Sequence, residues 1–222
     1  MHRLRIRFNR GKEVKFISHL DIMRFWERAL RRARIPLAYS EGFTPHPRIS
    51  LAAPLALGVT SETEFMDIVL QRWVSPHWFT EGITQQLPAG FGIMAVFPVP
   101  ITLPSLQSAV RFAEYRIEVE ASCGREEIEA AIEQLLAREE LPWHHQRDTG
   151  EHNYDLRALV EDVWVVDWPT DPAQDKSGQV GVVAMNLRCD AGGSGRPEQV
   201  VLALGIKEHP KSIHRTKLVL AA

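Results

Sequence analysis

Hydrophobic residues at the start of the chain alternate with charged ones, which is the period of a β-strand with one buried side. In residues 4–8, LRIRF, the apolar positions are Leu4, Ile6 and Phe8. The alternate positions are Arg3, Arg5 and Arg7. The pattern predicts a strand whose apolar side meets helices and whose other side is an open, cationic sheet face.

A helix is expected next, because apolar residues then recur at helical spacing. Ser18 and Asp21 form a capping-box-like start, and Pro36 ends the pattern. Three more segments follow in the order strand with bend, strand, and helix opened by Ser75 and Pro76: residues 49–58, 64–70 and 75–90. Residues 91–97, FGIMAVF, read as a last strand. The order βαββαβ is typical of a ferredoxin-like module.

The second half of the chain repeats this order of patterns. Residues 98–111 carry three prolines and no acid, which predicts a Pro-rich linker. Residues 114–120 alternate like a strand, and residues 125–140 form an acidic amphipathic helix. Later strand and helix patterns complete a second βαββαβ unit with an added hairpin. The predicted fold class is therefore α+β, with two tandem ferredoxin-like modules, 1–97 and 112–222, joined by the linker.

Charge divides the chain in the same way. The net charge is −2, but residues 1–50 hold 12 lysines and arginines against 4 carboxylates. Residues 101–222 hold 13 against 20. A basic first module suits a polyanion, and an acidic second module suits a protein partner.

The two cysteines, Cys123 and Cys189, lie far apart and form no CxxC pair. They predict a reduced, cytoplasmic protein without a disulfide framework. Two thiols are too few to hold an iron–sulfur cluster. No apolar run approaches the length of a membrane span, so no membrane partner is expected. We also expect no bound cofactor.

Arginine dominates the candidate binding residues. Its planar guanidinium pairs with phosphate and stacks on bases, so these positions are candidates for RNA contact. They are Arg3, Arg5, Arg7, Arg24, Arg28, Arg31, Arg32 and Arg48. The alternative is a solvated charged surface with some ion pairs to the acidic half.

The segment YSEGFTPHPRIS is a candidate recognition loop. Its residues are Ser40, Glu41, Gly42, Phe43, Thr44, Pro45, His46 and Pro47. The two prolines fix their own φ angles and hold the residues before them extended, while Gly42 permits a tight turn. Such a stiff loop could present Phe43 to a nucleobase or to a partner enzyme. The alternative is a rigid crossover in which Phe43 fills the core.

Histidines offer a weaker catalytic hypothesis. His19 and His46 could act as an acid–base pair of the kind used in RNA cleavage. The simpler interpretation is that Ser18 and Asp21 cap a helix and His19 is incidental. Asp67, a lone acid in an apolar strand, is expected to pair with an arginine or face solvent.

Two further motifs favour structural interpretations. His144, His145 and His152 match no zinc spacing, so no metal is expected. Residues 192–197, GGSGRP, lack the ending of a P-loop, and a glycine-rich hairpin turn is the favoured interpretation.

Residues 16–62, from FISHLD to GVTSE, resemble a bacterial family of radical SAM-linked proteins of unknown function. The similarity continues through EFMDIVL and returns at YDLRALVEDV, GRPEQVVLALG and HRTKL. The resemblance implies association with a radical SAM enzyme, to which members of this family are joined or adjacent. It implies no reaction of the chain itself, and the CxxxCxxC cluster motif is missing.

These observations favour an accessory subunit of a radical SAM enzyme over an enzyme in its own right. Its basic module would bind or present ribosomal or transfer RNA, and its acidic module would contact the enzyme. Two alternatives stay open: an RNA-processing enzyme using His46 and His19, and a purely protein-binding subunit.

Overall fold

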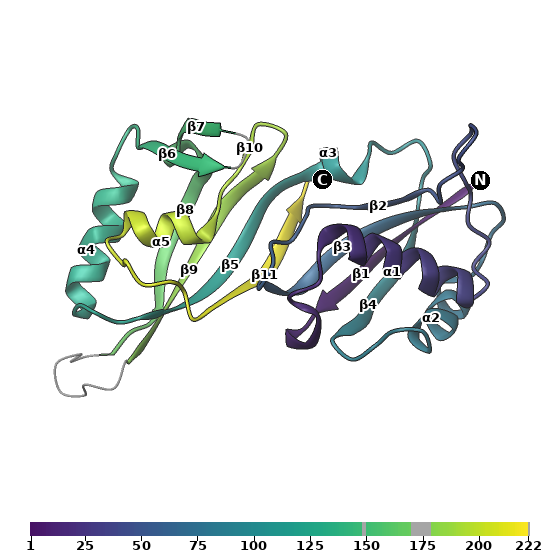
Figure 1. Cartoon of the computed structure of the whole chain (residues 1–222), viewed down its shortest axis with the longest axis horizontal. Helices are drawn as coiled ribbons and strands as arrows, with labels where there is room; N and C mark the ends of the chain where they lie inside the picture. Colours follow the sequence, from purple (N-terminus) through teal and green to yellow (C-terminus); the bar gives the residue numbers. More distant parts are fainter. Residues whose placement is uncertain (148–149, 170–178, 222) are drawn as a thin grey trace. The chain divides into compact units, whose positions relative to one another are not determined.

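The computed structural model describes residues 1–147, 150–169 and 179–221. The chain folds as two compact units, Met1–Val110 with Leu220–Ala222, and Arg111–Val219. Each unit combines helices with a β-sheet, which confirms a mixed α/β protein (Figure 1).

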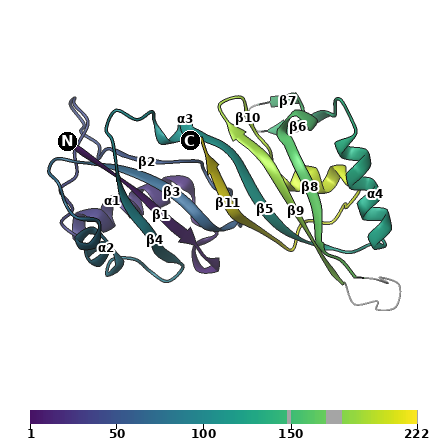
Figure 2. The same ribbon diagram turned by 180° about the vertical axis from the view of Figure 1, so that it is seen from behind.

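The first unit follows the element order that the sequence predicts. Its strands are β1 (His2–Arg10), β2 (Ile49–Leu51), β3 (Thr60–Leu70) and β4 (Phe91–Val99). Its helices are η1 (Lys12–Val14), α1 (His19–Arg32), α2 (Pro76–Thr84) and the short α3 (Leu106–Ala109). The strands lie in the order β4-β1-β3-β2, and every neighbouring pair is antiparallel. Figures 1 and 2 show α1 and α2 on one face of this sheet.

Alternation along β1 builds the core as expected. Leu4, Ile6 and Phe8 are buried against the helices, where Phe8 meets Trp26 edge to face at 5.1 Å. The cap of α1 is also confirmed, because the Ser18 hydroxyl oxygen accepts a hydrogen bond from the Asp21 amide.

The end of α1 is fixed by local backbone geometry. Arg34 has φ 55, and its amide donates to the Arg31 carbonyl. The Ile35 amide then donates to the Leu30 carbonyl. These two bonds form a Schellman motif just before Pro36, with arginine in the place that glycine usually takes.

The segment predicted as a linker, 98–111, contains regular structure. β4 continues through Val99, a helical turn capped by Ser105 forms α3, and β5 begins at Val110. Prolines suggested an irregular connection, but the carbonyls of Pro100 and Pro104 accept hydrogen bonds from Arg3. The buried Arg3 thus holds this segment against β1, within the first unit.

The second unit, in the part that the structure describes, consists of a sheet, a two-stranded hairpin and helices. Its strands are β5 (Val110–Glu120), β6 (Pro142–Arg147), β7 (Gly150–Asp155), β8 (Val160–Asp167), β9 (Val180–Asp190), β10 (Gly193–Ser194) and β11 (Ser212–Leu220). Its helices are α4 (Arg125–Leu136), η2 (Arg157–Leu159) and α5 (Pro197–Ala203). The sheet order is β10-β9-β5-β11, with β8 also paired to β9. Strands β6 and β7 pair as an antiparallel hairpin, and residues 148–149 between them lie outside the described residues.

Close contact at Gly181 gives a first prediction. A Cβ atom placed there would lie 2.3 Å from the Trp168 ring, whose indole donates to the Cys123 carbonyl at 2.9 Å. Gly181→Ala is therefore expected to destabilise the protein by about 1–3 kcal/mol, as overpacking of a core does. Urea denaturation measures the loss. Gly82→Ala is the matched control, because the atoms nearest to a Cβ placed there belong to Ala33 and lie 3.8 and 3.9 Å away, an ordinary van der Waals contact. Equal stability of both variants would contradict the prediction.

Candidate nucleic-acid interface

Two of the three candidate arginines on β1 are engaged inside the first unit. Arg5 forms a bidentate pair with Asp67 on β3, with Nε–Oδ1 2.8 Å and Nη2–Oδ2 2.9 Å. Arg3 is buried and donates to the carbonyls of Pro100, Leu103 and Pro104. The expected pairing of Asp67 with an arginine is confirmed.

The expectation of an open cationic sheet face therefore needs correction. Arg3 and Arg5 are not available to a ligand, because Arg3 is buried and bound to backbone carbonyls and Arg5 is paired with Asp67. Arg7 is the exposed member of the three. Alternation along one strand predicts which side chains share a face. It does not reveal the carboxylate that the register of a neighbouring strand places opposite them.

The same face carries aromatic residues that the charge pattern did not point to. Phe65 on β3 lies opposite Arg7, and Phe97 on β4 lies opposite Arg5. Phe97 is 37% exposed. Phe65 could have been assigned to the face of Asp67 from strand alternation, since it lies two residues earlier on the same strand. The face of Phe97 follows only from the register of β4 on β1.

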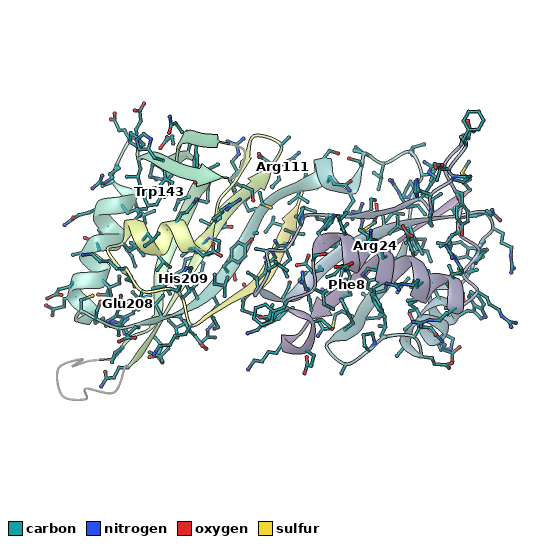
Figure 3. All side chains as sticks on the ribbon, viewed as in Figure 1. Phe8, Arg24, Arg111, Trp143, Glu208 and His209 are labelled. Atoms are coloured by element: carbon teal, nitrogen blue, oxygen red, sulfur yellow. The ribbon has the colours of Figure 1, made fainter. Side chains whose placement is uncertain are left out.

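The arginines of α1 are exposed, as predicted. Arg24 pairs with Asp21 at 3.2 Å, and Arg28 Nε donates to the Arg24 carbonyl at 3.1 Å. Figure 3 marks Arg24 on α1 and Phe8 on the strand that α1 covers. Arg31 and Arg32, in the last turn, form no ion pair within the described part of the chain. Their charge is available to a ligand.

Asp21, in the first turn of α1, accepts a hydrogen bond from Ser18, the N-cap residue of the same helix. The Ser18 hydroxyl donates to Asp21 at 2.7 Å, and this bond, with help from Arg24, lowers the pKa of Asp21. Asp21 therefore stays ionised and neutralises part of the charge of Arg24, which leaves the later arginines as the stronger anion-binding positions.

The candidate recognition loop is closed at its base by backbone contacts. Tyr39 and Pro47 form an isolated β-bridge, and the Ser40 amide donates to the His46 carbonyl at 2.8 Å. The His46 amide donates back to Ser40 Oγ at 3.0 Å. The loop between α1 and β2 projects away from the sheet in both Figure 1 and Figure 2.

Phe43 lies in this loop and is fully exposed. Gly42 beside it has φ 120, a left-handed conformation that suits glycine. The alternative in which Phe43 fills the core is thus wrong. A bare phenyl ring on a braced loop is a feature of a contact surface.

Several elements of the first unit end near the base of this loop. The Gln71 amide, just after β3, donates to the Pro36 carbonyl at 2.9 Å. Arg48 Nη1 lies 3.4 Å from Met1 Sδ, and the next residue, His2, meets the Trp73 ring at 5.7 Å. We call this surface the loop end. Its exposed residues include Arg31, Arg32, Arg34, Phe43, Arg48, Arg72, Trp73 and Trp78.

The structure does not bring His19 and His46 together. His19 is the first residue of α1, whereas His46 is bonded to Ser40 beyond the last turn of α1. A helix of 14 residues is about 21 Å long. An acid–base pair needs contact or one bridging water, so this arrangement offers no pair.

The remaining motifs are the histidines of residues 144–152 and the glycine-rich segment 192–197. The described residues contain no group of three or more His, Cys, Asp or Glu side chains that could hold a metal. The side chains of His145 and His152 are not among the described parts of the structure.

The glycine-rich turn joins β9 to β10, as expected. Burial opposes ionisation of Asp190 there, but bonds from Arg188 and the Gly192 amide lower its pKa overall. Within the described residues, no helix has both the length and the apolar character of a membrane span.

The fold and this surface together define a mixed α/β protein of two units, with exposed arginine and aromatic side chains at the loop end of the first. The chain belongs to the bacterial family described as "Uncharacterized protein conserved in bacteria (DUF2344)", which it matches over residues 3–197. No curated protein matches it.

A solved structure with a TM-score above 0.5 shares the fold at low sequence identity. A chain in "Crystal Structure of a Cbf5-Nop10-Gar1 Complex" has a TM-score of 0.54 and 11% identity, covering 97% of this chain and 48% of that chain. A chain in "Crystal structure of the archaeal box H/ACA sRNP Nop10-Cbf5 complex" has a TM-score of 0.49 and 11% identity, with coverages of 97% and 48%. This chain spans about half the length of those it matches. At such identity the likeness concerns the fold alone.

Proposed function

We propose that the protein is a non-catalytic accessory protein that binds RNA at the loop end and presents it to a radical SAM enzyme. The observation that carries the proposal is the gathering of accessible cations around a braced loop with an exposed phenyl ring. Arg31 and Arg32 end α1, and Arg48 follows the loop. Between Arg31 and Ser50 the chain holds one carboxylate, Glu41. Phosphates are attracted to such a surface, and little on it competes for the guanidinium groups.

The fold assignment beneath this proposal is a ferredoxin-like module in each unit. In the first unit the order βαββαβ and the antiparallel sheet β4-β1-β3-β2 support it. In the second unit the succession of β5, α4, β8, β9, α5 and β11 supports it, with β6 and β7 as an inserted hairpin. We retain the domain boundaries 1–97 and 112–222 as part of this proposal.

The second unit is the proposed contact for the enzyme. The reason for a radical SAM partner is the resemblance of residues 16–62 to the linked family. Exposed carboxylates on and after α4 supply a surface of opposite charge to the loop end, among them Glu126, Glu127, Glu133, Glu139 and Glu140. Separate surfaces of opposite charge would let one molecule hold RNA and a protein at once.

Removing the two arginines of the last turn of α1 tests RNA binding. The double variant Arg31→Ala, Arg32→Ala is expected to weaken binding of single-stranded RNA. It should also make the slope of log affinity against log salt shallower by about 1.4, because each phosphate contact contributes about 0.7. Fluorescence anisotropy of a labelled oligouridylate across a salt series measures both.

Arg138→Ala is the control, because Arg138 is an exposed arginine that lies just beyond α4 in the second unit. It should leave the slope unchanged. A wild-type protein that binds no RNA even at low salt would remove the proposal and leave a purely protein-binding subunit. An unchanged slope in the double variant would exclude the end of α1 as the phosphate contact.

A further inference from the structure

Large aromatic side chains are exposed at the loop end. Trp73 is 48% exposed and Trp78 is 42% exposed, while Phe43 is fully exposed. Trp73 lies in the connection between β3 and α2, and Trp78 lies in the first turn of α2. Tryptophan loses much favourable burial when it stays in water, so exposed indoles around one surface indicate a contact role.

Each of these rings stands on a fixed backbone. Trp73 meets His2 edge to face, with an interplanar angle of 66°. Val74, the next residue, is buried, and the Trp78 amide donates to the Ser75 cap at 3.2 Å. The hydrogen bonds at the base of the loop brace the segment that carries Phe43. Rings on fixed supports lose little conformational entropy when a planar ligand stacks on them.

Exposed arginines neighbour the rings along the chain, since Arg72 precedes Trp73 and Arg48 follows the loop of Phe43. Arg72 is exposed beside Trp73, and Gln71 links this connection to Pro36, two residues beyond Arg34. Residues 71–80 contain no carboxylate. Guanidinium groups interleaved with exposed aromatic faces form the usual surface for single-stranded nucleic acid, because cations follow the phosphates while the unpaired bases stack.

A duplex would leave these rings unused. Its bases are already stacked, and double-stranded RNA is recognised through its shape, phosphates and 2′-hydroxyls. Arginines alone would be sufficient for that kind of contact. The exposed indoles and the phenyl ring therefore favour a ligand whose bases are free.

We infer that the loop end binds single-stranded RNA by stacking unpaired bases on Trp73 and Phe43, with Trp78 as a neighbouring plate. This inference rests on the proposed function and specifies its ligand. Arg48 and Arg72 contact the adjoining phosphates. The aromatic residues thus select single-stranded over double-stranded RNA, and the arginines supply affinity.

The test compares two probes on the full chain: a fluorescein-labelled oligouridylate, and an RNA duplex of equal length. Trp73→Ala is expected to weaken binding of the oligouridylate roughly five- to a hundred-fold, as loss of one base stack does. Trp73→Phe should retain most of the affinity, because a phenyl ring still stacks. Phe43→Ala should also weaken binding of the single strand, and it should change stability little because the side chain is fully exposed.

Trp164→Ala is the matched control, since Trp164 is a 37% exposed tryptophan of the second unit. It should bind both probes as the wild type does. If Trp73→Ala and Phe43→Ala both bind the oligouridylate normally, the inference fails. It also fails if the duplex binds as tightly as the single strand, although RNA binding itself then stands. If the wild type binds neither probe, both the inference and the proposed function fail.

Discussion

Asp67→Ala is expected to destabilise the protein by about 3–5 kcal/mol, the usual cost of removing one partner from a buried ion pair. Asp67 and Arg5 have side-chain exposures of 3% and 12%, so water does little to screen or replace their interaction. Arg3 Nε also lies 3.8 Å from this carboxylate. The substitution would leave two guanidinium groups without their shared anion. Urea denaturation followed by circular dichroism measures the loss.

The matched control is Asp21→Ala, which removes an exposed carboxylate that also pairs with an arginine. Asp21 and Arg24 have side-chain exposures of 56% and 68%. The variant removes this surface pair and the bond from the Ser18 cap, both of which are exposed to water, so it should lose much less stability than Asp67→Ala. The double variant Arg5→Met, Asp67→Leu should recover part of the stability, because it removes Arg5 together with its anion and leaves Arg3 bound to backbone carbonyls. If Asp67→Ala is as stable as Asp21→Ala, the buried pair does not support the sheet.

Strong periodic patterns made the order of elements predictable. Leu4, Ile6 and Phe8 indicated the buried side of β1, and Ser18 and Pro36 bounded α1 to within a few residues. These signals are local, because each depends on residues a few positions apart. The exposed stripe of arginines on α1 followed from the same spacing.

Contacts between distant segments were harder to foresee. Asp67 is 62 positions from Arg5, and only the register of β1 on β3 places them opposite each other. Arg3 is bound by carbonyls about 100 positions away, in a segment whose prolines suggested a linker. Every residue has a backbone carbonyl, so residue types do not show which carbonyls will accept hydrogen bonds. No local feature of the sequence therefore predicted that Arg3 would be bound within the protein and unavailable at the candidate interface.

Aromatic residues of the loop end were missed for a different reason. Trp73 lies just before α2 and Trp78 lies in its first turn. Hydrophobic residues at such positions suggest core packing. Their exposure depends on which side of the first helical turn faces the sheet, and Phe79 and Ile83 take that side. A helical wheel of α2 places Trp78 away from Ile83, which was the available signal.

Helix α1 supports both the fold and the proposed interface. Its buried side holds Trp26 against Phe8 and Phe91, and its exposed side carries the arginines. Any change that unfolds α1 would therefore also remove the proposed phosphate-binding side. Stability and binding can still be separated, because Trp26 itself is fully buried and touches no ligand surface.

Trp26→Ala is expected to destabilise the protein by about 3–5 kcal/mol, the range for truncating a large buried aromatic side chain. The variant would leave a cavity beside Phe8, Phe25 and Phe91, whose ring centroids lie 5.1, 5.4 and 5.8 Å from the indole. Trp26→Phe should lose much less. The indole N–H has no hydrogen-bond partner among the described residues, so a phenyl ring gives up volume but no bond.

Urea denaturation ranks the wild type and the two Trp26 variants, and equal losses for both variants would mean that the site cannot accommodate a smaller ring. Folded Trp26→Ala should bind the oligouridylate with wild-type affinity at a temperature where it remains native. Weaker binding by that folded protein would show that α1 moves when its buried contact is lost. The arrangement of the arginines, rather than their number, would then be the determinant of affinity.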